Sequence, residues 1–457
     1  MSKFAKKSSE LAKINAGFTI VELLIVVVVI AILAAITVVS YNGITKRATE
    51  ATMQHDLQTA VQLIEIESTE TGSYPGSAAG LNGGKGLVGS GDNQITYVSL
   101  AGGYCVSVAN PKTSTQLKAS SLSGQIVPGT CVITNGGVVS TYVGSGTAGS
   151  MDGNGTSAQL TSTYGIAIDS AGNLYISNTA IRKITVGGDV AVLSGSMISQ
   201  GNANGPSATA RFYGPKGMAV DSAGYVYVGE AGNSLIRKIA PDGTASTLAG
   251  SYPEGYADGN GTAAKFNAAN GVAVSSAGVV YVADTNNNRI RKIMPNGDVT
   301  PFAGSGVAGS LNGNGTTAQF NKPEGIAIDA AGALYVADTV NNRIRKIMPN
   351  GDVTTLAGSG TIGSADNSTG ALAQFNRPLG ITVDSIGNVY VADTSNNLIR
   401  KITPAGAVST LAGSTTAGFV NDTGSAARFN GPTALVVDAS GVLYVADNAN
   451  YRIRKIQ

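Results

Sequence analysis

The sequence predicts a multidomain fold in which a long N-terminal α-helix and a small α+β domain precede an all-β, six-bladed propeller. Three observations support this expectation. An apolar run of helical length follows a basic leader near the start of the chain. A second, amphipathic pattern of helical period continues beyond it. From residue 138 to the end, a segment with four strand signals recurs every 52 to 55 residues.

The apolar run is long enough to cross a lipid bilayer. Phe18 to Val39 is apolar except for Thr19, Glu22 and Thr37, and these 22 residues at about 1.5 Å each extend roughly 33 Å as a helix. In lipid a lone segment has to satisfy its own backbone hydrogen bonds, so we expect a membrane helix over residues 18–40. The leader, residues 1–17, carries four lysines and one glutamate, a net charge of +3 (4 − 1), which favours keeping that end in the cytoplasm.

Two residues distinguish this segment from a plain anchor. Gly17 stands where the leader meets the apolar run, and Glu22 places a carboxylate inside it. The stretch GFTIVELL resembles the N-terminus of type IV pilins (prepilins). The resemblance implies cleavage by a prepilin peptidase between Gly17 and Phe18, N-methylation of Phe18, and pairing of Glu22 with the amino terminus of a neighbouring subunit. A carboxylate in hydrocarbon is costly unless it meets a cation, which agrees with that pairing.

A secretory signal peptide or a plain anchor is the alternative interpretation. A signal peptide is cut after its apolar run, beside small residues, and no clear A-x-A-like site follows this one. A plain anchor has no need of Glu22 or of the Gly17–Phe18 junction. We therefore expect the N-terminal helix to assemble with other pilin subunits.

Residues 41–135 are expected to form a pilin-like stem and globular domain. Apolar residues such as Met53, Leu57 and Ile64 continue at helical spacing until about Glu70. The single histidine, His55, is expected at a solvated position of this helix. The candidate strands that follow are Ile95–Leu100, Tyr104–Ala109 and Val127–Ile133.

The two cysteines of the chain, Cys105 and Cys131, fall in this small domain. Transport across a membrane into an oxidising compartment favours a disulfide between them. It would close a loop of about 25 residues and contribute roughly 3 kcal/mol in the chain-entropy model. Two free thiols are the alternative, although no nearby residue would activate either of them.

The C-terminal part, residues 136–457, consists of six repeats. NNRIRKIMPNGDVT occurs twice without change, at Asn287–Thr300 and Asn341–Thr354. The repeat that starts at Phe320 has its four strand signals at Gly325–Asp329, Leu334–Asp338, Arg343–Ile347 and Val353–Ala357. Four strands per repeat is the pattern of a β-propeller blade.

The two ends of the array predict how the ring closes. The last repeat stops after its third strand, at Arg452–Ile456. The segment 138–145, VVSTYVGS, precedes the first repeat and is similar to the fourth strands. We expect it to complete the last blade, which removes an open sheet edge. The repeats resemble NHL repeats through GIAID, LYVAD and NNRIRKI, and the first repeat departs from them at Ser177 and Asn178.

Acidic and basic residues recur in register along the repeats. We expect cross-strand ion pairs that hold each blade, and a charged ring that binds an anionic or glycan ligand is the alternative. The second and third strands supply the pairs Asp284 and Arg291, Asp338 and Arg345, Asp393 and Arg400, and Asp447 and Arg454.

Several classes of function are disfavoured by composition. Charged residues are only 13% of the chain and the net charge is +2, so no nucleic-acid partner is expected. The loops around Asp152, Asn154, Asp258 and Asn260 hold too few carboxylates for calcium, so we interpret these residues as helix caps and turns. Near-identical blades argue against a singular catalytic site, so neither an enzyme, a metal nor a cofactor is expected.

The sequence therefore indicates a minor or tip pilin-like subunit that displays a propeller for adhesion or for recognition of a protein or glycan. Such a subunit would reside in the cytoplasmic membrane before assembly and in an extracellular pilus or at the cell surface afterwards. A pseudopilin of a secretion or DNA-uptake system and a membrane-tethered, lactonase-like propeller enzyme are the alternatives.

Overall fold

The computed structural model describes residues 20–71, 78, 81, 86–100, 103–111, 116–120, 127–128 and 137–457, with the side chains of 20–44, 71, 98–100, 103, 120 and 127–128 outside the description. The chain divides into two compact units, Met1–Ile133 and Thr134–Gln457. Gly17, Phe18 and Cys131 lie outside the described residues, as does the side chain of Glu22. The predicted cleavage, methylation and disulfide therefore stay predictions.

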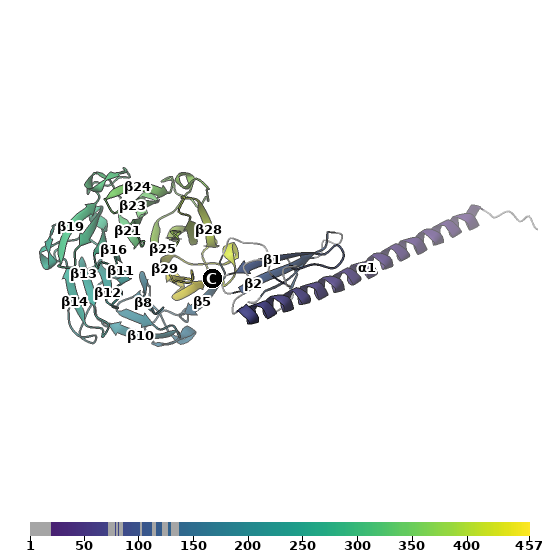
Figure 1. Ribbon diagram of the computed structural model, residues 1–457, viewed down its shortest axis with the longest axis horizontal. Coiled ribbons are helices and arrows are strands. Elements are labelled where there is room, and N and C mark those ends of the chain that lie inside the picture. The colour runs from purple at the N-terminus through teal and green to yellow at the C-terminus, as the bar shows by residue number, and fades with distance from the viewer. Residues whose placement is uncertain are drawn as a thin grey trace, which may run out of the picture. The chain divides into compact units, whose positions relative to one another are not determined.

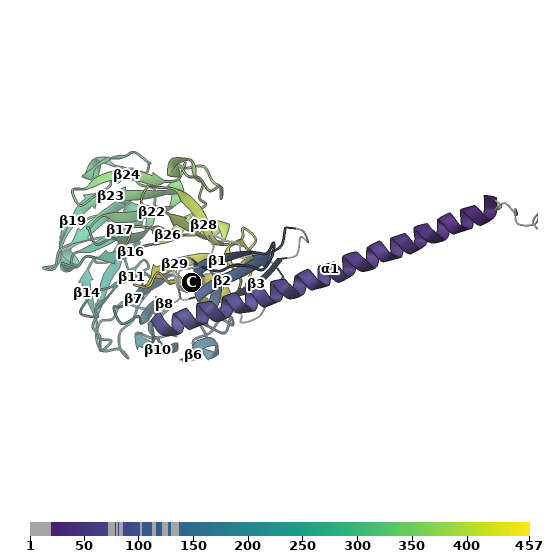
Figure 2. The same ribbon diagram turned by 45° about the vertical axis from the view of Figure 1, so that its right-hand side comes forward.

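The first unit contains one long helix and a four-stranded antiparallel sheet. Helix α1 runs without interruption over Ile20–Thr71, and Figures 1 and 2 show β1 and β2 lying along its C-terminal part. The sheet has the order β1-β2-β3-β4. Its strands are β1 (Gln94–Leu100), β2 (Gly103–Ala109), β3 (Gln116–Ser120) and β4 (Val127–Pro128). The end of the helix and the first two strands are as predicted, whereas β3 was not predicted.

The helix packs on this sheet through the residues expected from their spacing. Met53, Leu57 and Ile64 are fully buried against β2 and β3, whereas His55 is exposed as expected. Asp56 joins the same face by accepting hydrogen bonds from Ser90 N, Ser90 Oγ and Asn93 Nδ2 at 2.8, 2.6 and 2.7 Å. Burial opposes ionisation of Asp56, but these hydrogen bonds outweigh it and lower its pKa.

In the part of the chain that the structure describes, no helix combines the length and the apolar character needed to span a membrane.

The second unit is a ring of six antiparallel sheets around a common centre (Figure 1). Blades 1 to 6 are numbered in chain order, and in each the second strand pairs with the first and third. The inner strands are β7 (Gly165–Ile168), β11 (Pro215–Val220), β16 (Ala269–Val274), β21 (Pro323–Ile328), β25 (Pro378–Val383) and β29 (Pro432–Val437). The second strands are β8 (Leu174–Ser177), β12 (Val226–Glu230), β17 (Val280–Asp284), β22 (Leu334–Asp338), β26 (Val389–Asp393) and β30 (Leu443–Asp447).

The third and fourth strands form the outer half of each blade. The third strands are β9 (Ile181–Ile184), β13 (Leu235–Ile239), β18 (Arg289–Ile293), β23 (Arg343–Ile347), β27 (Leu398–Ile402) and β31 (Arg452–Ile456). The fourth strands of blades 1 to 5 are β10 (Asp189–Ser194), β14 (Ala245–Ala249), β19 (Asp298–Ala303), β24 (Asp352–Ala357) and β28 (Val408–Gly413). Two-residue strands of the preceding linker cover the outer edge in blades 1, 3 and 4: β6 (Gly153–Asn154), β15 (Gly259–Asn260) and β20 (Gly313–Asn314).

The ring closes as the sequence predicts. Strand β5 (Val139–Val143) is the fourth strand of blade 6 and pairs with β31, from Val139 opposite Ile456 to Val143 opposite Ile453. Val138 N donates to Gln457 O at 2.8 Å, and Gln457 N donates back at 3.0 Å. The hydrophobic cores lie between neighbouring blades, where five phenylalanines are fully buried: Phe212, Phe266, Phe320, Phe375 and Phe429.

One buried arginine lies at the centre of every blade. In blade 4, Arg345 Nη1 lies 2.8 Å from Asp338 Oδ2 and donates to Gln319 O at 2.8 Å. Arg345 Nη2 donates to Leu311 O at 3.1 Å and to Asn312 Oδ1 at 2.8 Å. The arginine therefore joins the second strand, the third strand and the linker that precedes the blade.

The equivalent arginines have no exposed side-chain surface, so these ion pairs cannot present a charged ring to an external ligand. The acid lies at 2.7 to 3.1 Å in the other four complete pairs: Arg237 with Glu230, Arg291 with Asp284, Arg400 with Asp393, and Arg454 with Asp447. Blade 1 has Asn178 instead, and its Arg182 pairs only with the linker residue Asp152, at 2.6 Å.

Asp152, Asp258, Asn154 and Asn260 were expected to serve as helix caps and turn residues, and the capping part of that expectation was wrong. Asp152 and Asp258 each accept a hydrogen bond at 2.6 Å from the buried arginine of their blade. Asn154 and Asn260 do precede short 3-10 helices, but their side chains make no capping bond. Each instead donates from Nδ2, at 2.9 Å, to an aspartate at the start of the fourth strand. In blades 1 and 3 these carboxylates neutralise a buried cation, and an unpaired buried cation costs more stability than a missing cap on a three-residue helix.

Blades 4 and 5 offer a matched test of the buried ion pair. Asp338→Asn leaves Arg345 with the neutral Asn312, whereas Asp393→Asn leaves Arg400 with Asp366, whose Oδ1 lies 2.7 Å away. We expect Asp338→Asn to cost about 3–5 kcal/mol of unfolding free energy and Asp393→Asn clearly less. Urea unfolding followed by circular dichroism measures both. Adding Asn312→Asp should restore part of the loss in the first variant, and equal losses for the two single variants would contradict this account.

Buried tyrosines on the second strands should lower the free energy of unfolding at alkaline pH, because their pKa values are raised in the folded protein. Tyr335 donates to Asp329 Oδ2 at 3.1 Å, and burial followed by this hydrogen bond raises the pKa of Tyr335 to about 12. A raised pKa stabilises the fold fully below the unfolded value of about 10, and that stability is lost as the pH rises through 12. Tyr281 has Ser275 in place of the aspartate, and burial alone raises its pKa.

We therefore expect Tyr335→Phe to flatten the fall in stability between these pH values more than Tyr281→Phe does. Thermal unfolding at a series of alkaline pH values, with tyrosinate absorbance recorded in parallel, provides the measurement. Parallel pH profiles for the wild type and both variants would show that these hydroxyls do not govern the alkaline transition.

Candidate binding site at the mouth of the propeller channel

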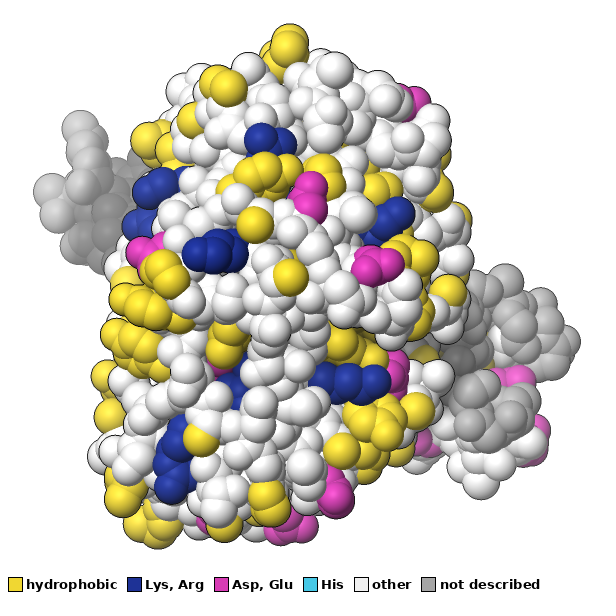
Figure 3. Space-filling view, turned by 90° about the vertical axis from the view of Figure 1, so that its left-hand side faces the viewer, with side chains coloured by type: hydrophobic (Ala, Val, Ile, Leu, Met, Phe, Trp, Pro, Cys, Tyr) yellow, Lys and Arg dark blue, Asp and Glu magenta, His cyan; other side chains and the backbone are white. Residues whose placement is uncertain are grey.

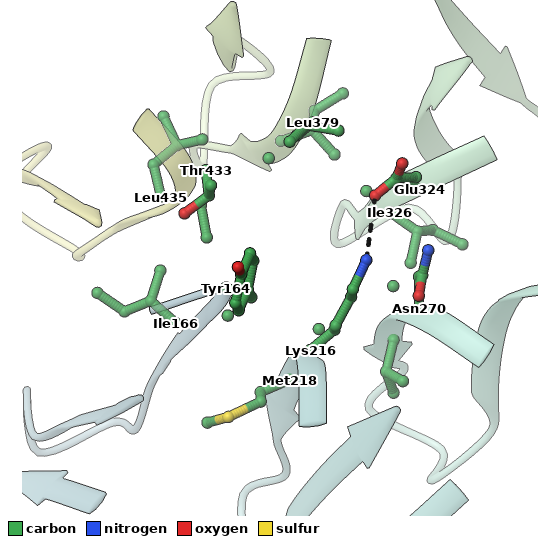
Figure 4. Close-up of a pocket in the computed structure, with 18 of the residues that line it drawn as sticks. Tyr164, Ile166, Lys216, Met218, Asn270, Glu324, Ile326, Leu379, Thr433 and Leu435 are labelled. Carbon is green, nitrogen blue, oxygen red and sulfur yellow. Dashed lines mark ion pairs between the residues drawn. The ribbon is translucent and has the colours of Figure 1, made fainter. Parts of the chain in front are cut away.

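The inner strands of the six blades enclose a central cavity of about 210 Å³ (Figure 4). Every blade contributes three consecutive residues to its wall. The first of the three is different in every blade, the second is glycine in five blades, and the third is always apolar. The first positions are Tyr164, Lys216, Asn270, Glu324, Leu379 and Thr433.

Glycine at the second position sets the width of the channel. A Cβ atom added at Gly271 or Gly325 would meet the main-chain oxygen of Glu324 or Leu379, the variable residue of the next blade. The inner strands therefore approach each other so closely that only glycine fits there. In five inner strands, β11, β16, β21, β25 and β29, the pairing with the second strand also slips near this point. Such bulges re-aim side chains, and here they adjoin the channel.

The third positions form an apolar floor below the variable residues. All six are at least nine-tenths buried: Ile166, Met218, Val272, Ile326, Ile381 and Leu435. The cavity therefore has a polar and chemically varied mouth above an apolar base, which is the general character of small-molecule sites.

One side of the mouth is polar. Lys216 Nζ lies 3.8 Å from Glu324 Oε2, and the two side chains remain 34% and 21% exposed. Asn270 comes from the blade between them and is only 4% exposed. Its Oδ1 is buried and receives no hydrogen bond from any described residue. A buried acceptor without a donor costs about 1–3 kcal/mol, so this oxygen requires an explanation.

The opposite side is aromatic and apolar. Tyr164 is 46% exposed, and Lys216 Nζ lies 5.8 Å from the centre of its ring. Leu379 contributes an apolar side chain to the cavity from blade 5, two blades away from Tyr164 around the ring (Figure 4). Thr433 is buried, and its hydroxyl donates to Thr163 O at 2.6 Å, so that hydroxyl is not free to donate to a ligand.

Sequence reasoning missed this site because it compared the repeats for what they share. Near-identical blades argue against a singular catalytic site, but they do not rule out a singular binding site, because six residues of different chemistry meet at the channel mouth. The signal was present in the sequence: the residue before the second-position glycine, or before alanine in blade 6, differs in every repeat.

The side of the propeller that includes β14 and β19 carries dispersed charges. In Figure 3, lysine and arginine side chains are scattered among uncharged ones, with acidic side chains between them. On this side no large basic patch is available for a nucleic acid to contact.

Two family models match the chain. The prokaryotic N-terminal methylation motif matches residues 13–38, which include Gly17, Phe18 and Glu22. The NHL repeat matches residues 266–293, 320–347, 375–402 and 429–456. Each NHL match starts at a buried phenylalanine and ends with the third strand of blades 3 to 6.

The curated relatives share the repeat region only. The chain is 31% identical over 280 residues to the Arabidopsis thaliana protein SUPPRESSOR OF QUENCHING 1, chloroplastic, a match that covers 57% of this chain and 26% of the relative. It is 28% identical to NHL repeat-containing protein 2 of Bos taurus, covering 56% and 40%, and 25% identical to mouse Teneurin-4, covering 57% and 13%. The chain thus spans well under two thirds of the length of these relatives.

Solved structures support the fold. A Bacteroides thetaiotaomicron protein of unknown function is similar with a TM-score of 0.56 at 23% identity, over 78% of this chain and 82% of that one. An auxiliary nutrient binding protein of Bacteroides ovatus is similar with a TM-score of 0.53 at 17% identity, over 80% and 90%. At these identities the likeness concerns the fold alone. The chain therefore carries a prokaryotic N-terminal methylation motif and an NHL-repeat β-propeller.

Proposed function

We propose that the protein is a minor or tip subunit of a type IV pilus-like filament and that its propeller is a recognition head. The observation that carries this proposal is the presence of the methylation motif and an NHL propeller in one chain. The channel mouth supports recognition, because it gathers residues of different chemistry in an otherwise repetitive ring.

The N-terminal segment would supply the filament contacts. Residues 18–40 would cross the membrane before assembly and pack against other subunits afterwards. Cleavage after Gly17 would free the amino group of Phe18, and Glu22 of a neighbouring subunit would pair with it. The propeller would then be displayed outside the cell, after passage through the cytoplasmic membrane.

The size of the head favours a minor or tip position. A domain of about 320 residues has a radius of gyration near 20 Å, so its diameter is roughly 50 Å. Packed helices lie about 8–10 Å apart. Heads of that width would collide if every subunit of a filament carried one.

The N-terminal mass of the chain in sheared surface filaments and in washed membranes tests the proposal. We expect the filament fraction to contain a chain that begins at methylated Phe18. A chain that retains Met1 or Ser2 and stays in membranes would overturn the filament role.

A pair of substitutions on the same helix tests assembly. Glu22→Ala should be processed normally but fall at least about tenfold in the filament fraction, because an unpaired terminal amine in an apolar interface is costly. Glu70→Ala is the matched control, since Glu70 is an exposed acid at the far end of α1. Equal recovery of both variants in filaments would exclude the assembly role of Glu22.

A further inference from the structure

We infer that the channel mouth binds one sugar ring, as the terminal residue of a surface glycan, with Asn270 Oδ1 accepting a hydrogen bond from a sugar hydroxyl. This inference deepens the proposed function and rests on it, because it treats the propeller as a recognition head.

The first argument is the unpartnered oxygen of Asn270. The side chain is 4% exposed, lines the cavity and has no donor for Oδ1 among the described residues. The other blades have no asparagine at this position, so blade architecture does not require it. A buried acceptor among the residues that line the mouth suits a donor that arrives with a ligand.

The second argument is the neighbouring ion pair. Lys216 and Glu324 meet in front of Asn270 at a long distance of 3.8 Å, and both keep unused hydrogen-bonding capacity. A hydroxyl both donates and accepts, so adjacent hydroxyls can accept from Lys216 while they donate to Glu324 and Asn270. The ion pair then stays intact. A charged ligand would instead have to compete with the internal counter-ion of one of these residues.

The third argument is the opposite wall. Tyr164 presents a half-exposed aromatic ring, and Leu379 adds an apolar side chain to the cavity from blade 5, two blades away around the ring. A sugar ring is amphipathic, with hydroxyls around its edge and carbon-bound hydrogens on its faces. Its edge would meet the polar side while one face lies against Tyr164. Because the third positions are apolar, we expect the polar mouth to receive a chain end, with the rest of the glycan leading out.

Arg377 would distinguish an acidic sugar from a neutral sugar. It lines the mouth at an exposed position and adds a positive charge that Glu324 does not neutralise. An acidic sugar would reach this cation with its carboxylate, and a neutral sugar would leave it solvated. Both share the hydroxylated ring that the inference requires.

The test uses the full chain in a zwitterionic, sugar-free detergent. The probes are the methyl glycosides of glucose, galactose, mannose, N-acetylglucosamine and glucuronic acid, with glycylglycine as the charged peptide probe. Saturation-transfer NMR and calorimetry measure binding. We expect at least one glycoside to bind, and a preference for the glucuronoside that declines with salt would identify the acidic source.

Two variants locate the binding. Asn270→Ala should weaken it at least about tenfold, while the unfolding temperature stays unchanged or rises, because the lost oxygen has no partner in the free protein. Asn286→Ala makes the same chemical change at an exposed turn of blade 3 and should bind normally. Tyr164→Ala, at an exposed position, should weaken binding without loss of stability.

The inference is overturned if no glycoside binds, if Asn270→Ala binds as well as the wild type, or if only glycylglycine binds. These outcomes are separate from those of the filament test. A chain that binds a glycoside but remains unprocessed in membranes would contradict only the filament role. A processed filament subunit that binds no glycoside would contradict only this inference.

Discussion

The buried arginine of each blade is the interaction on which the propeller depends. A guanidinium with no exposed surface is tolerable only where carboxylates and main-chain oxygens surround it. In this ring the partners come from three places: the acid of the second strand, main-chain oxygens beside the buried phenylalanine, and the linker. The same cation therefore fixes the order of strands within a blade and the path of the chain into it. Where Asn178 removes the strand acid in blade 1, Asp152 of the linker supplies the charge.

In this frame, one position of each inner strand can differ between blades: the residue before the second-position glycine. The glycines of the inner strands hold neighbouring blades so close that their main chains nearly touch. The residue before each glycine is released from that constraint, because it faces the channel. Six copies of one structural unit thus place Tyr164, Lys216 and Asn270 beside Glu324, Leu379 and Thr433, although about 50 residues separate neighbours in the sequence. The residues that the repeats share form the ring, and the residues that differ at this single position form the binding site.

The sequence was sufficient for the repeat domain because that domain rests on local and periodic patterns. Four strand signals per repeat, the closing strand at the start of the array and the helix through Met53 and Leu57 are all in the structure. Strand β3 was missed because its alternation is short, with only Leu117 and Ala119 apolar. The channel mouth could not be predicted in the same way, because its residues meet only after ring closure. The linker aspartates were misinterpreted for a related reason, since their arginine partners lie about 30 residues away.

The two parts of the chain carry function in physically different forms. The N-terminal motif acts through adjacent residues, so a short match such as that over residues 13–38 can reveal it. The propeller acts through residues that are remote in sequence, so matches to its repeats reveal the frame and not the ligand. What marks the site is a combination of two features: a register position that varies between blades, and at that position a buried oxygen, Asn270 Oδ1, without a donor among the described residues. The propeller is stabilised elsewhere, by its buried arginines and by ring closure. It can therefore accept the loss of stability that the unpartnered oxygen of Asn270 causes, in return for ligand binding.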